Sequence, residues 1–531
     1  MKRSKHSLTH YKLFSAKMGL LIPCSWFEVL PGDTIQMSTS ALVRANAMVT
    51  PAMHPCHIRI HHFFVPNRII WGGTIQNDQS NSDSWEAFIT GGSDGLNATI
   101  HPWVKYTDIN GAVGNNCGQS TLGDYLGLRT SGGTSSADSV NALPFRAYQA
   151  IWNEYFRDQD LQGAAGVAQT SGHDTTTYTG LQNIAWEKDY LTSSRPWEVK
   201  GSSITIPLGT TAPVIGIGVQ ASVSDGGAGT VYESEGTGSV SYPHTFALNQ
   251  AGLAFKAQTT GAAGNTNRPQ IFADLSNASA VTINTLRHAL AVQRFEEARA
   301  RYGSRYTEYL RYLGVRSSDA RLQRPEYLGG GRATLQISEV LNTTATNPAS
   351  LYGHGIAATR SNRFRRFFEE HGIVMTMFSV RPRTMYSQAT NRAWLRGQTS
   401  AVGGGGVIPN GLLGTKEDYW QRELQHIGQQ QVNGAEADAQ NAYNTTFGYQ
   451  DRYGEYRRME SSVAGTFRSS FDTWQLSREF GSAPSLNSTF VSCVPSTRIF
   501  ADTTNDNLLV MAHHSIQARR LVSREGNSLT F

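Results

Sequence analysis

The feature that most constrains this chain is the segment from Ala273 to Arg332, which carries the longest helical pattern in the sequence. Apolar residues recur at helical spacing on two of its sides: Ile283, Leu286 and Leu290 on one, Val292 and Phe295 on the other. A helix that is apolar on two sides is normally packed on two sides. Elsewhere the chain consists of short apolar runs separated by glycine and turn residues, so this segment predicts a helical brace joined to a sheet.

A second helical pattern follows Gly303, a residue that allows the first helix to break. Tyr302, Tyr306 and Tyr309 share one face of this second pattern. An aromatic face of this kind packs in a core or against another subunit, and we predict these three tyrosines at a packed subunit contact. The glycines Gly329–Gly331 then predict a hinge that leads into a strand.

Three other patterns define local structure. Residues 57–61 alternate isoleucine with His57, Arg59 and His61, which predicts a half-buried strand whose histidines face solvent or an interface. The unbroken apolar run 373–380 is typical of a fully buried strand, and the aromatic pattern of Leu143–Gln162 predicts an amphipathic helix. These patterns favour a mainly β chain with a few helices.

Several phrases of the sequence resemble the major capsid proteins of microviruses, in particular the gokushovirus branch. They include RYGSRYTEYLRYLGVRSSDARLQRPEYLGGG, FFVPNRIIW, WNEYFRDQ and HGIVMTMFSVRPRTMY, together with most of the carboxyl-terminal third. The resemblance extends from about Leu20 to Arg520, apart from residues 163–269. This extent makes a coincidence implausible.

The resemblance implies a fold and a function. The fold would be a single eight-stranded antiparallel jelly roll, mainly β, spanning residues 1–531 with long loop insertions. The protein would assemble with copies of itself into a small icosahedral shell around a single-stranded DNA genome. Minor virion proteins and a host-surface receptor would be further partners, with assembly in the host cytoplasm. The sequence itself supports the short strands but not their order.

Residues 163–269 differ from the rest in composition. They are poor in charge and dense in glycine, alanine, serine and threonine. A long stretch of this kind is either disordered or a projecting β-rich insertion. In the resembling family an insertion here forms a protrusion at the threefold axes, and we carry over that location only.

Arginine supplies most of the basic charge, because only nine of the 46 Lys and Arg residues are lysine. A guanidinium can fork to phosphate and stack on bases, although a preference for arginine codons would also explain the count. Residues 1–19 form a basic N-terminal arm without an acidic residue, which would lie on phosphates or remain a solvated terminus.

A second basic cluster surrounds residues 360–383, where arginines alternate with phenylalanines. Such a cluster can neutralise phosphates and stack on unpaired bases, but it can also pair with Glu369, Glu370 or a neighbouring subunit. Two more arginines follow the apparent final strand, so we expect them to leave the sheet. The predicted DNA contacts are therefore Lys2, Arg3, Lys5, Arg365, Arg366, Arg519 and Arg520.

Other classes of protein have little support in the sequence. Cys24, Cys56, Cys117 and Cys493 are scattered without paired spacing, so we predict neither a disulfide framework nor a zinc ribbon. We find no phosphate-loop, nucleophile-elbow or zinc-protease motif, and we expect no catalysis, cofactor, metal or membrane insertion. The alternative is a non-catalytic phage β-sandwich protein, such as a fibre or receptor-binding module.

Overall fold

The computed structural model describes residues 3–72, 84–90, 100–135, 137–201, 283–303, 305–341, 350–395, 399–402, 406–409, 424–432 and 446–522, with four short strands between 214 and 273. The chain divides into two compact units. The larger comprises residues 1–198 and 299–531, and the smaller comprises Val199–Ala298.

The larger unit is built around an antiparallel sheet that has ten strands among the described residues. Its strands are β1 (Ser4–Ser7), β2 (His10–Ala16), β3 (Ile22–Val29), β4 (Thr34–Ala45), β5 (Cys56–Pro66), β14 (Glu326–Leu341), β15 (Leu351–Arg360), β16 (Phe364–Phe367), β17 (Gly372–Pro382) and β22 (Leu508–Arg520). Their order is β1–β22–β4–β15–β14–β5–β17–β3; β2 continues the β1 position along β22, and β16 pairs with β4.

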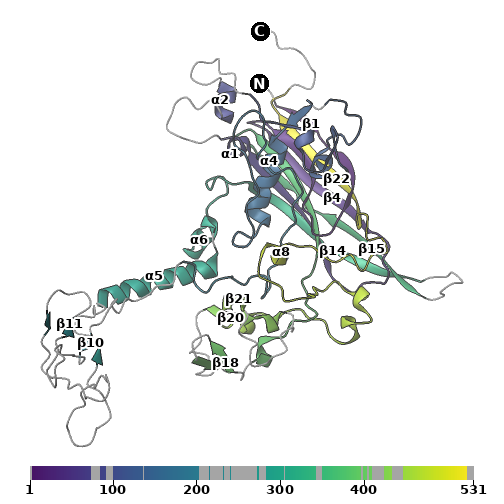
Figure 1. Ribbon diagram of the computed structural model, residues 1–531. Coiled ribbons are helices and arrows are strands. Elements are labelled where there is room, and N and C mark those ends of the chain that lie inside the picture. The colour runs from purple at the N-terminus through teal and green to yellow at the C-terminus, as the bar shows by residue number, and fades with distance from the viewer. Residues whose placement is uncertain are drawn as a thin grey trace, which may run out of the picture. The chain divides into compact units, whose positions relative to one another are not determined.

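The sheet curls on itself through the long strand β14. Residues 326–335 of β14 pair with β5, while residues 336–341 pair with β15. This division gives one layer of β22, β4 and β15, which Figure 1 labels beside β14. The second layer consists of β5, β17 and β3. The predicted mainly β, antiparallel fold with few helices is confirmed, and its curled path is consistent with a jelly roll.

Burial along the strands explains which residues form the core. In β22, buried positions alternate with exposed or half-buried ones from Leu508 to Arg519, as a strand with one face in the core requires. By contrast, Gly372–Val380 of β17 is buried on both faces, so the predicted buried strand is confirmed. The interior between the layers holds aliphatic residues such as Val43, Ile58 and Val510.

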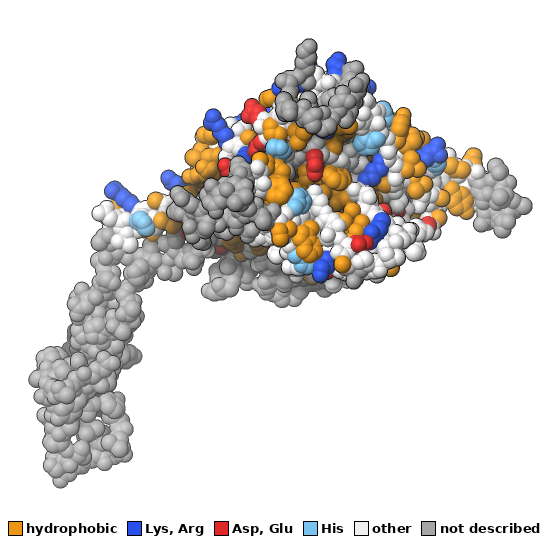
Figure 2. Space-filling view, turned by 90° about the horizontal axis from the view of Figure 1, so that it is seen from above, with side chains coloured by type: hydrophobic (Ala, Val, Ile, Leu, Met, Phe, Trp, Pro, Cys, Tyr) orange, Lys and Arg blue, Asp and Glu red, His pale blue; other side chains and the backbone are white. Residues whose placement is uncertain are grey.

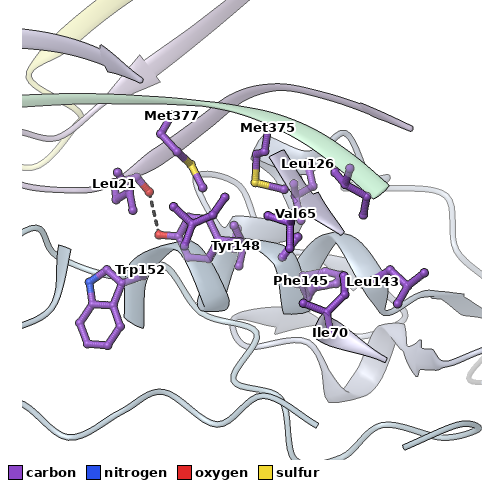
Figure 3. Close-up of a cluster of buried hydrophobic side chains, with 14 of the residues drawn as sticks. Leu21, Val65, Ile70, Leu126, Leu143, Phe145, Tyr148, Trp152, Met375 and Met377 are labelled. Atoms are coloured by element: carbon purple, nitrogen blue, oxygen red, sulfur yellow. Dashed lines mark hydrogen bonds between the residues drawn. The ribbon is translucent and has the colours of Figure 1, made fainter. Parts of the chain in front are cut away.

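Helix α4 (Leu143–Ile151) covers the outer face of β5 and β17. Its Phe145 and Tyr148 pack with Val65, Met375 and neighbouring apolar side chains (Figure 3). The Tyr148 hydroxyl donates a hydrogen bond of 2.7 Å to the carbonyl of Leu21. The predicted helix of residues 143–162 is therefore confirmed in its first part, but it closes with a π-helical turn at Trp152–Phe156.

The glycines of β14 do not form the predicted hinge, because the strand continues through Gly329–Gly331. A side chain at Gly330 would clash with the carbonyl oxygen of Ile60, and one at Gly331 with that of Arg360. Gly329 has φ +147 where the register with β5 shifts. Close approach of other backbone segments therefore explains these glycines.

Two helices form within the segment from Ala273 to Arg332: α5 (Ile283–Tyr302) and α6 (Tyr306–Tyr312). They are separated by Gly303, whose φ of +104 confirms the predicted break. The expectation that α5 is packed on two sides is wrong for the single chain, because Ile283, Leu290 and Phe295 are all more than half exposed.

The remaining elements are short. The larger unit contains α1 (Asn67–Ile70), α2 (Trp85–Thr90), α3 (Leu122–Leu126), α7 (Gly454–Arg457), α8 (Ser488–Val491) and the strand pairs β6 (Trp103–Lys105) with β9 (Ser139–Asn141), β7 (Ala112–Val113) with β8 (Asn116–Cys117), β18 (Thr399–Val402) with β19 (Gly406–Pro409), and β20 (Leu424–Gly428) with β21 (Thr446–Asp451). The smaller unit pairs β10 (Val214–Ile215) with β13 (Phe272–Ala273) and β11 (Val231–Tyr232) with β12 (Ser239–Val240).

Candidate nucleic-acid and subunit interfaces

Strand register brings three of the predicted DNA-contact residues to one face of the sheet. Lys5 of β1 lies directly opposite Arg519 of β22, and Arg519 lies opposite Thr34 of β4. Arg365 of β16 belongs to the neighbouring row, since it lies opposite Gln36. Directly opposed residues of antiparallel strands point to the same side of a sheet. Lys5, Arg365 and Arg519 therefore share one outward face.

Arg3 extends this basic surface. Its guanidinium lies 5.1 Å from the ring centre of Phe367, the residue opposite Thr34 on β16. Within the part of the chain that the structure describes, Arg3, Lys5, Arg365 and Arg519 form no ion pair with a carboxylate. All four are exposed, so this group, called here the basic end of the sheet, can offer its charge to an anion.

The other predicted DNA contacts behave differently. Arg366 pairs with Glu326 at 2.8 Å, and Arg520 pairs with the buried Asp33 at 3.1 Å. The expectation that Arg519 and Arg520 leave the sheet is wrong, because β22 continues to Arg520. Lys2 lies outside the described residues.

Apolar side chains lie next to the basic end on the same layer. Tyr11, Leu13, Leu509 and Met511 of β2 and β22 point outward and are exposed, Leu13 by 78%. Figure 2, a view from above, shows that hydrophobic side chains are also exposed over much of the described surface on that side. An exposed apolar area beside positive charge is suited to contact with another macromolecule.

The predicted subunit-contact tyrosines are exposed within the single chain. Tyr302 and Tyr306 are exposed by 52% and 65%, while Tyr309 is half-buried. The Tyr302 ring lies 4.4 Å from that of Tyr312, and the Arg299 guanidinium lies over Tyr309. The structure thus gathers these rings near the α5–α6 junction.

Arg305 holds that junction against the turn after α4. Its guanidinium donates hydrogen bonds to the carbonyls of Asn153 and Arg157, at 3.1 and 2.8 Å, and to the side chain of Gln159 at 3.0 Å. The start of α6 is therefore fixed by polar contacts, although its tyrosines remain exposed.

A polar layer crosses the interior between the two sheet layers. The His62 ring is hydrogen-bonded to the hydroxyls of Ser361 and Thr376, at 2.8 and 2.9 Å, and the His514 ring to Thr39 at 2.9 Å. Burial lowers the pKa of both histidines to about 3, so both are neutral at neutral pH. For His62, which follows the predicted strand of residues 57–61, the expectation of a solvent-facing or interface histidine is wrong, because its ring is fully buried.

One cluster of charged residues around Glu187 was not predicted from the sequence. Glu187 accepts a hydrogen bond of 3.1 Å from Arg59, and its carboxylate lies 3.9 and 3.7 Å from Arg381 and Arg383. Arg332 lies directly opposite Arg59 in the sheet. Although burial raises the pKa of the Glu187 carboxyl, the charges of these arginines, including Arg332, lower it. These residues come from segments far apart in the sequence, so no local motif marks them.

The described residues contain no group of three or more His, Cys, Asp or Glu side chains placed to hold a metal ion. All four cysteines are buried and free. None of the described helices combines the length and apolar character needed to cross a membrane.

Comparison with known proteins identifies the family. Residues 1–526 match the family model described as capsid protein (F protein). The chain is 34% identical over 520 residues to capsid protein VP1 of Bdellovibrio phage phiMH2K, covering 92% of this chain and 87% of that protein. It is 30% identical over 577 residues to VP1 of Chlamydia phage 1 (94% and 91%), and 29% identical over 519 residues to VP1 of Spiroplasma virus 4 (92% and 87%). The predicted resemblance is confirmed, and the chain belongs to the F-protein family of phage capsid proteins.

Proposed function

We propose that this capsid protein self-assembles into a closed icosahedral shell around a single-stranded DNA genome and performs no catalysis. The observation that carries the proposal is the family match over nearly the whole chain, with relatives named capsid proteins. Exposed apolar surfaces in the single chain support it, because a shell subunit must bury surface against several neighbours. The alternative of a fibre or receptor-binding protein has no support among the three relatives.

Electron microscopy and size-exclusion chromatography of the purified full-length chain test assembly. We expect closed particles of uniform diameter that elute in the megadalton range. A small oligomer that forms no particles under any assembly condition would contradict the proposal.

We further propose that the basic end of the sheet contacts the genome. Each subunit meets different bases, so the contact must neutralise phosphates without reading sequence. Arg3, Lys5, Arg365 and Arg519 fit this requirement, because they are exposed and lie together on one face. Phe367 beside Arg3 offers a ring on which a base can stack. Arg366 and Arg520 fit it less well, since each already pairs with a carboxylate.

Charge removal tests this contact. Replacing Lys5, Arg365 and Arg519 together by glutamine should leave shells intact but reduce the DNA packaged per particle and its resistance to salt. Arg457→Gln is the matched control, since Arg457 is an exposed arginine on α7 with one carboxylate partner. Equal packaging by all variants would refute the contact. Deleting the first residues tests Lys2 in the same way.

Two other surfaces complete the proposal. Tyr302, Tyr306 and Tyr309 would pack against a neighbouring subunit, because exposed aromatic rings on a fixed helix junction are suited to burial in an interface. Within the predicted insertion of residues 163–269, the part from Val199 onward, which belongs to the smaller unit, would form a surface protrusion near the threefold axes, where a host-surface receptor is met. Minor virion proteins would be additional partners.

A further inference from the structure

Outside the basic end of the sheet, four arginines gather around a single carboxylate on the other sheet layer. Arg59 comes from β5, Arg332 from β14, Arg381 from β17, and Arg383 follows directly after β17. Glu187 is that carboxylate, and the positive charges of all four arginines lower its pKa against the effect of burial. The group therefore carries four positive charges against one negative charge.

The arginines are held in place by neutral partners. Arg381 donates a hydrogen bond of 2.9 Å to the Ala185 carbonyl, and Arg332 one of 2.8 Å to Nε2 of His57. Burial, and then the charge of Arg332, lower the pKa of His57, so this histidine accepts the bond in its neutral form. Neither partner offsets the positive charge.

Several polar atoms of the cluster lack a partner. In the described part of the chain, Nε of Arg59 and Arg381 and one carboxylate oxygen of Glu187 are buried without a hydrogen bond. Burial, and then the neighbouring guanidinium of Arg59, lower the pKa of Arg381. Uncompensated positive charge at a partly buried site is unfavourable unless an anion binds there.

The cluster is also accessible. The side chains of Arg383 and Arg59 are 48% and 28% exposed. Glu187 and Arg381 border a pocket of about 290 Å³ whose wall also holds three carboxylates and four basic side chains: Asp158, Asp160, Glu308, Arg157, Lys188, Arg195 and Arg305. An anion can therefore reach the guanidinium groups of Arg383 and Arg59 from solvent.

We propose that the cluster of Arg59, Arg332, Arg381 and Arg383 binds a phosphate group, either a free phosphate ion or a backbone phosphate of single-stranded DNA. The DNA source rests on the proposed function, whereas the free ion does not. Guanidinium groups bind phosphate through paired hydrogen bonds, and several of them can share its oxygens. A neighbouring subunit's carboxylate would bring one negative charge, as a DNA backbone phosphate does, so assembly is measured beside binding for each variant.

Binding to the full-length subunit, kept dissociated, tests the site with two probes. Inorganic phosphate is followed by calorimetry and a fluorescent oligothymidylate by anisotropy, each for the unmutated chain and for Arg332→Gln and Arg383→Gln. We expect each substitution to weaken phosphate binding about tenfold, because it removes a charged hydrogen-bond donor. If DNA occupies the site, the salt slope of oligonucleotide binding falls by roughly 0.7 for one lost phosphate contact.

Two further variants separate binding from structure. Glu187→Gln removes the competing carboxylate, so it should tighten phosphate binding several-fold; if it destabilises the fold, phosphate should raise its unfolding temperature more than that of the unmutated chain. Arg457→Gln is the control, because Arg457 lies 3.6 Å from one carboxylate and is 53% exposed, much like Arg383. It should leave phosphate affinity within about twofold.

The outcomes are distinct. Weaker binding of both probes supports a DNA phosphate, and weaker phosphate binding alone supports a free ion. Unchanged affinity for both probes overturns the site. Loss of assembly with unchanged affinity also overturns it and assigns the cluster to a neighbour's carboxylate. Particle formation by the unmutated chain is scored separately, so the site stands if phosphate binds although no shell forms.

Discussion

Replacement of Arg146 by methionine should lower the free energy of unfolding of this chain more than replacement of any exposed arginine does. Arg146 of α4 and Asp174 are both fully buried and 2.7 Å apart. The guanidinium also donates hydrogen bonds to the carbonyls of Ile70 and Thr170, at 3.1 and 2.8 Å. One side chain therefore joins α1, α4 and the segment around residues 170–174.

The magnitude follows from what the substitution leaves behind. In Arg146→Met the buried Asp174 carboxylate keeps hydrogen-bond donors from Thr176 and Thr177 only. The carbonyls of Ile70 and Thr170 also lose the donor that Arg146 provides. Breaking a buried pair from one side costs about 3–5 kcal/mol. Methionine fills much of the volume of the arginine stem, so we assign the expected loss of about 4 kcal/mol to charge and hydrogen bonding rather than to a cavity.

The sign of the pH dependence tests this assignment. In the unmutated protein, burial alone would raise the pKa of Asp174, but hydrogen bonds from Thr177 and Arg146 outweigh it and the pKa is lowered. Its contribution to stability is thus present above the unfolded-state pKa of about 3.9 and is lost as pH falls through the folded-state value. In Arg146→Met the pKa of Asp174 should be higher than in the unmutated protein, because only the Thr177 hydrogen bonds then oppose the effect of burial. The difference in free energy of unfolding from the unmutated protein should therefore shrink as pH falls through this higher pKa.

Urea unfolding of the dissociated subunit, followed by tryptophan fluorescence, measures these quantities. Adding Asp174→Asn to Arg146→Met should recover part of the loss, since the stranded charge is gone. Arg457→Met, at an exposed pair, should cost no more than about 1 kcal/mol. A loss below about 1 kcal/mol for Arg146→Met, or a loss that does not change with pH, would refute the reasoning.

Three further predictions concern folding and assembly. Burial lowers the pKa of His62 to about 3, so the subunit should become less stable as pH falls below the unfolded-state pKa of about 6.5, by about 2 kcal/mol at pH 5. In unfolding experiments His62→Asn should reduce this pH dependence, and an unchanged pH profile would count against it. Gly331→Ala should cost about 1–3 kcal/mol because the new methyl group meets the backbone near Arg360, whereas Gly481→Ala, in open space, should be nearly neutral. Tyr306→Ala should preserve subunit stability but raise the concentration needed for assembly, measured by light scattering, with Tyr456→Ala as the exposed control; equal assembly would remove Tyr306 from the contact.

Sequence patterns predicted correctly those elements whose buried sides can be read from a single segment. The apolar run 373–380 predicted a buried strand because both faces of β17 are covered, one by the interior and one by α4. The aromatic spacing from Leu143 predicted α4 for the same reason. In both cases the periodicity of a single segment records which sides of it are buried.

Features that depend on distant backbone could not be predicted. Gly331 suggested a hinge, but its role is set by the carbonyl of Arg360, which belongs to another strand. Likewise, Arg365 and Arg366 are adjacent in sequence, yet one faces outward without an ion pair among the described residues and the other pairs with Glu326. Only strand register distinguishes them. The cluster around Glu187 needs three strands and a loop, so its members cannot be grouped before the fold is known.

The exposed apolar surfaces connect the fold to assembly. On sequence alone, α5 should be packed on two sides, but Ile283, Leu290 and Phe295 are exposed in the single chain, as are Leu13 and Tyr11 on the sheet. Full burial of one such side chain contributes about 1.5–3 kcal/mol. A few buried per contact therefore stabilise any one interface only modestly after the cost of association.

In a closed shell every subunit makes several contacts at once, so modest interfaces act together. This reasoning predicts a separation of effects between two kinds of site. Substitutions in the buried polar and ionic contacts, such as Arg146 and His62, should alter subunit unfolding, because their partners lie in the same chain. Substitutions of exposed apolar residues such as Leu13 should leave unfolding unchanged and act on assembly, with an effect that grows with the number of copies joined.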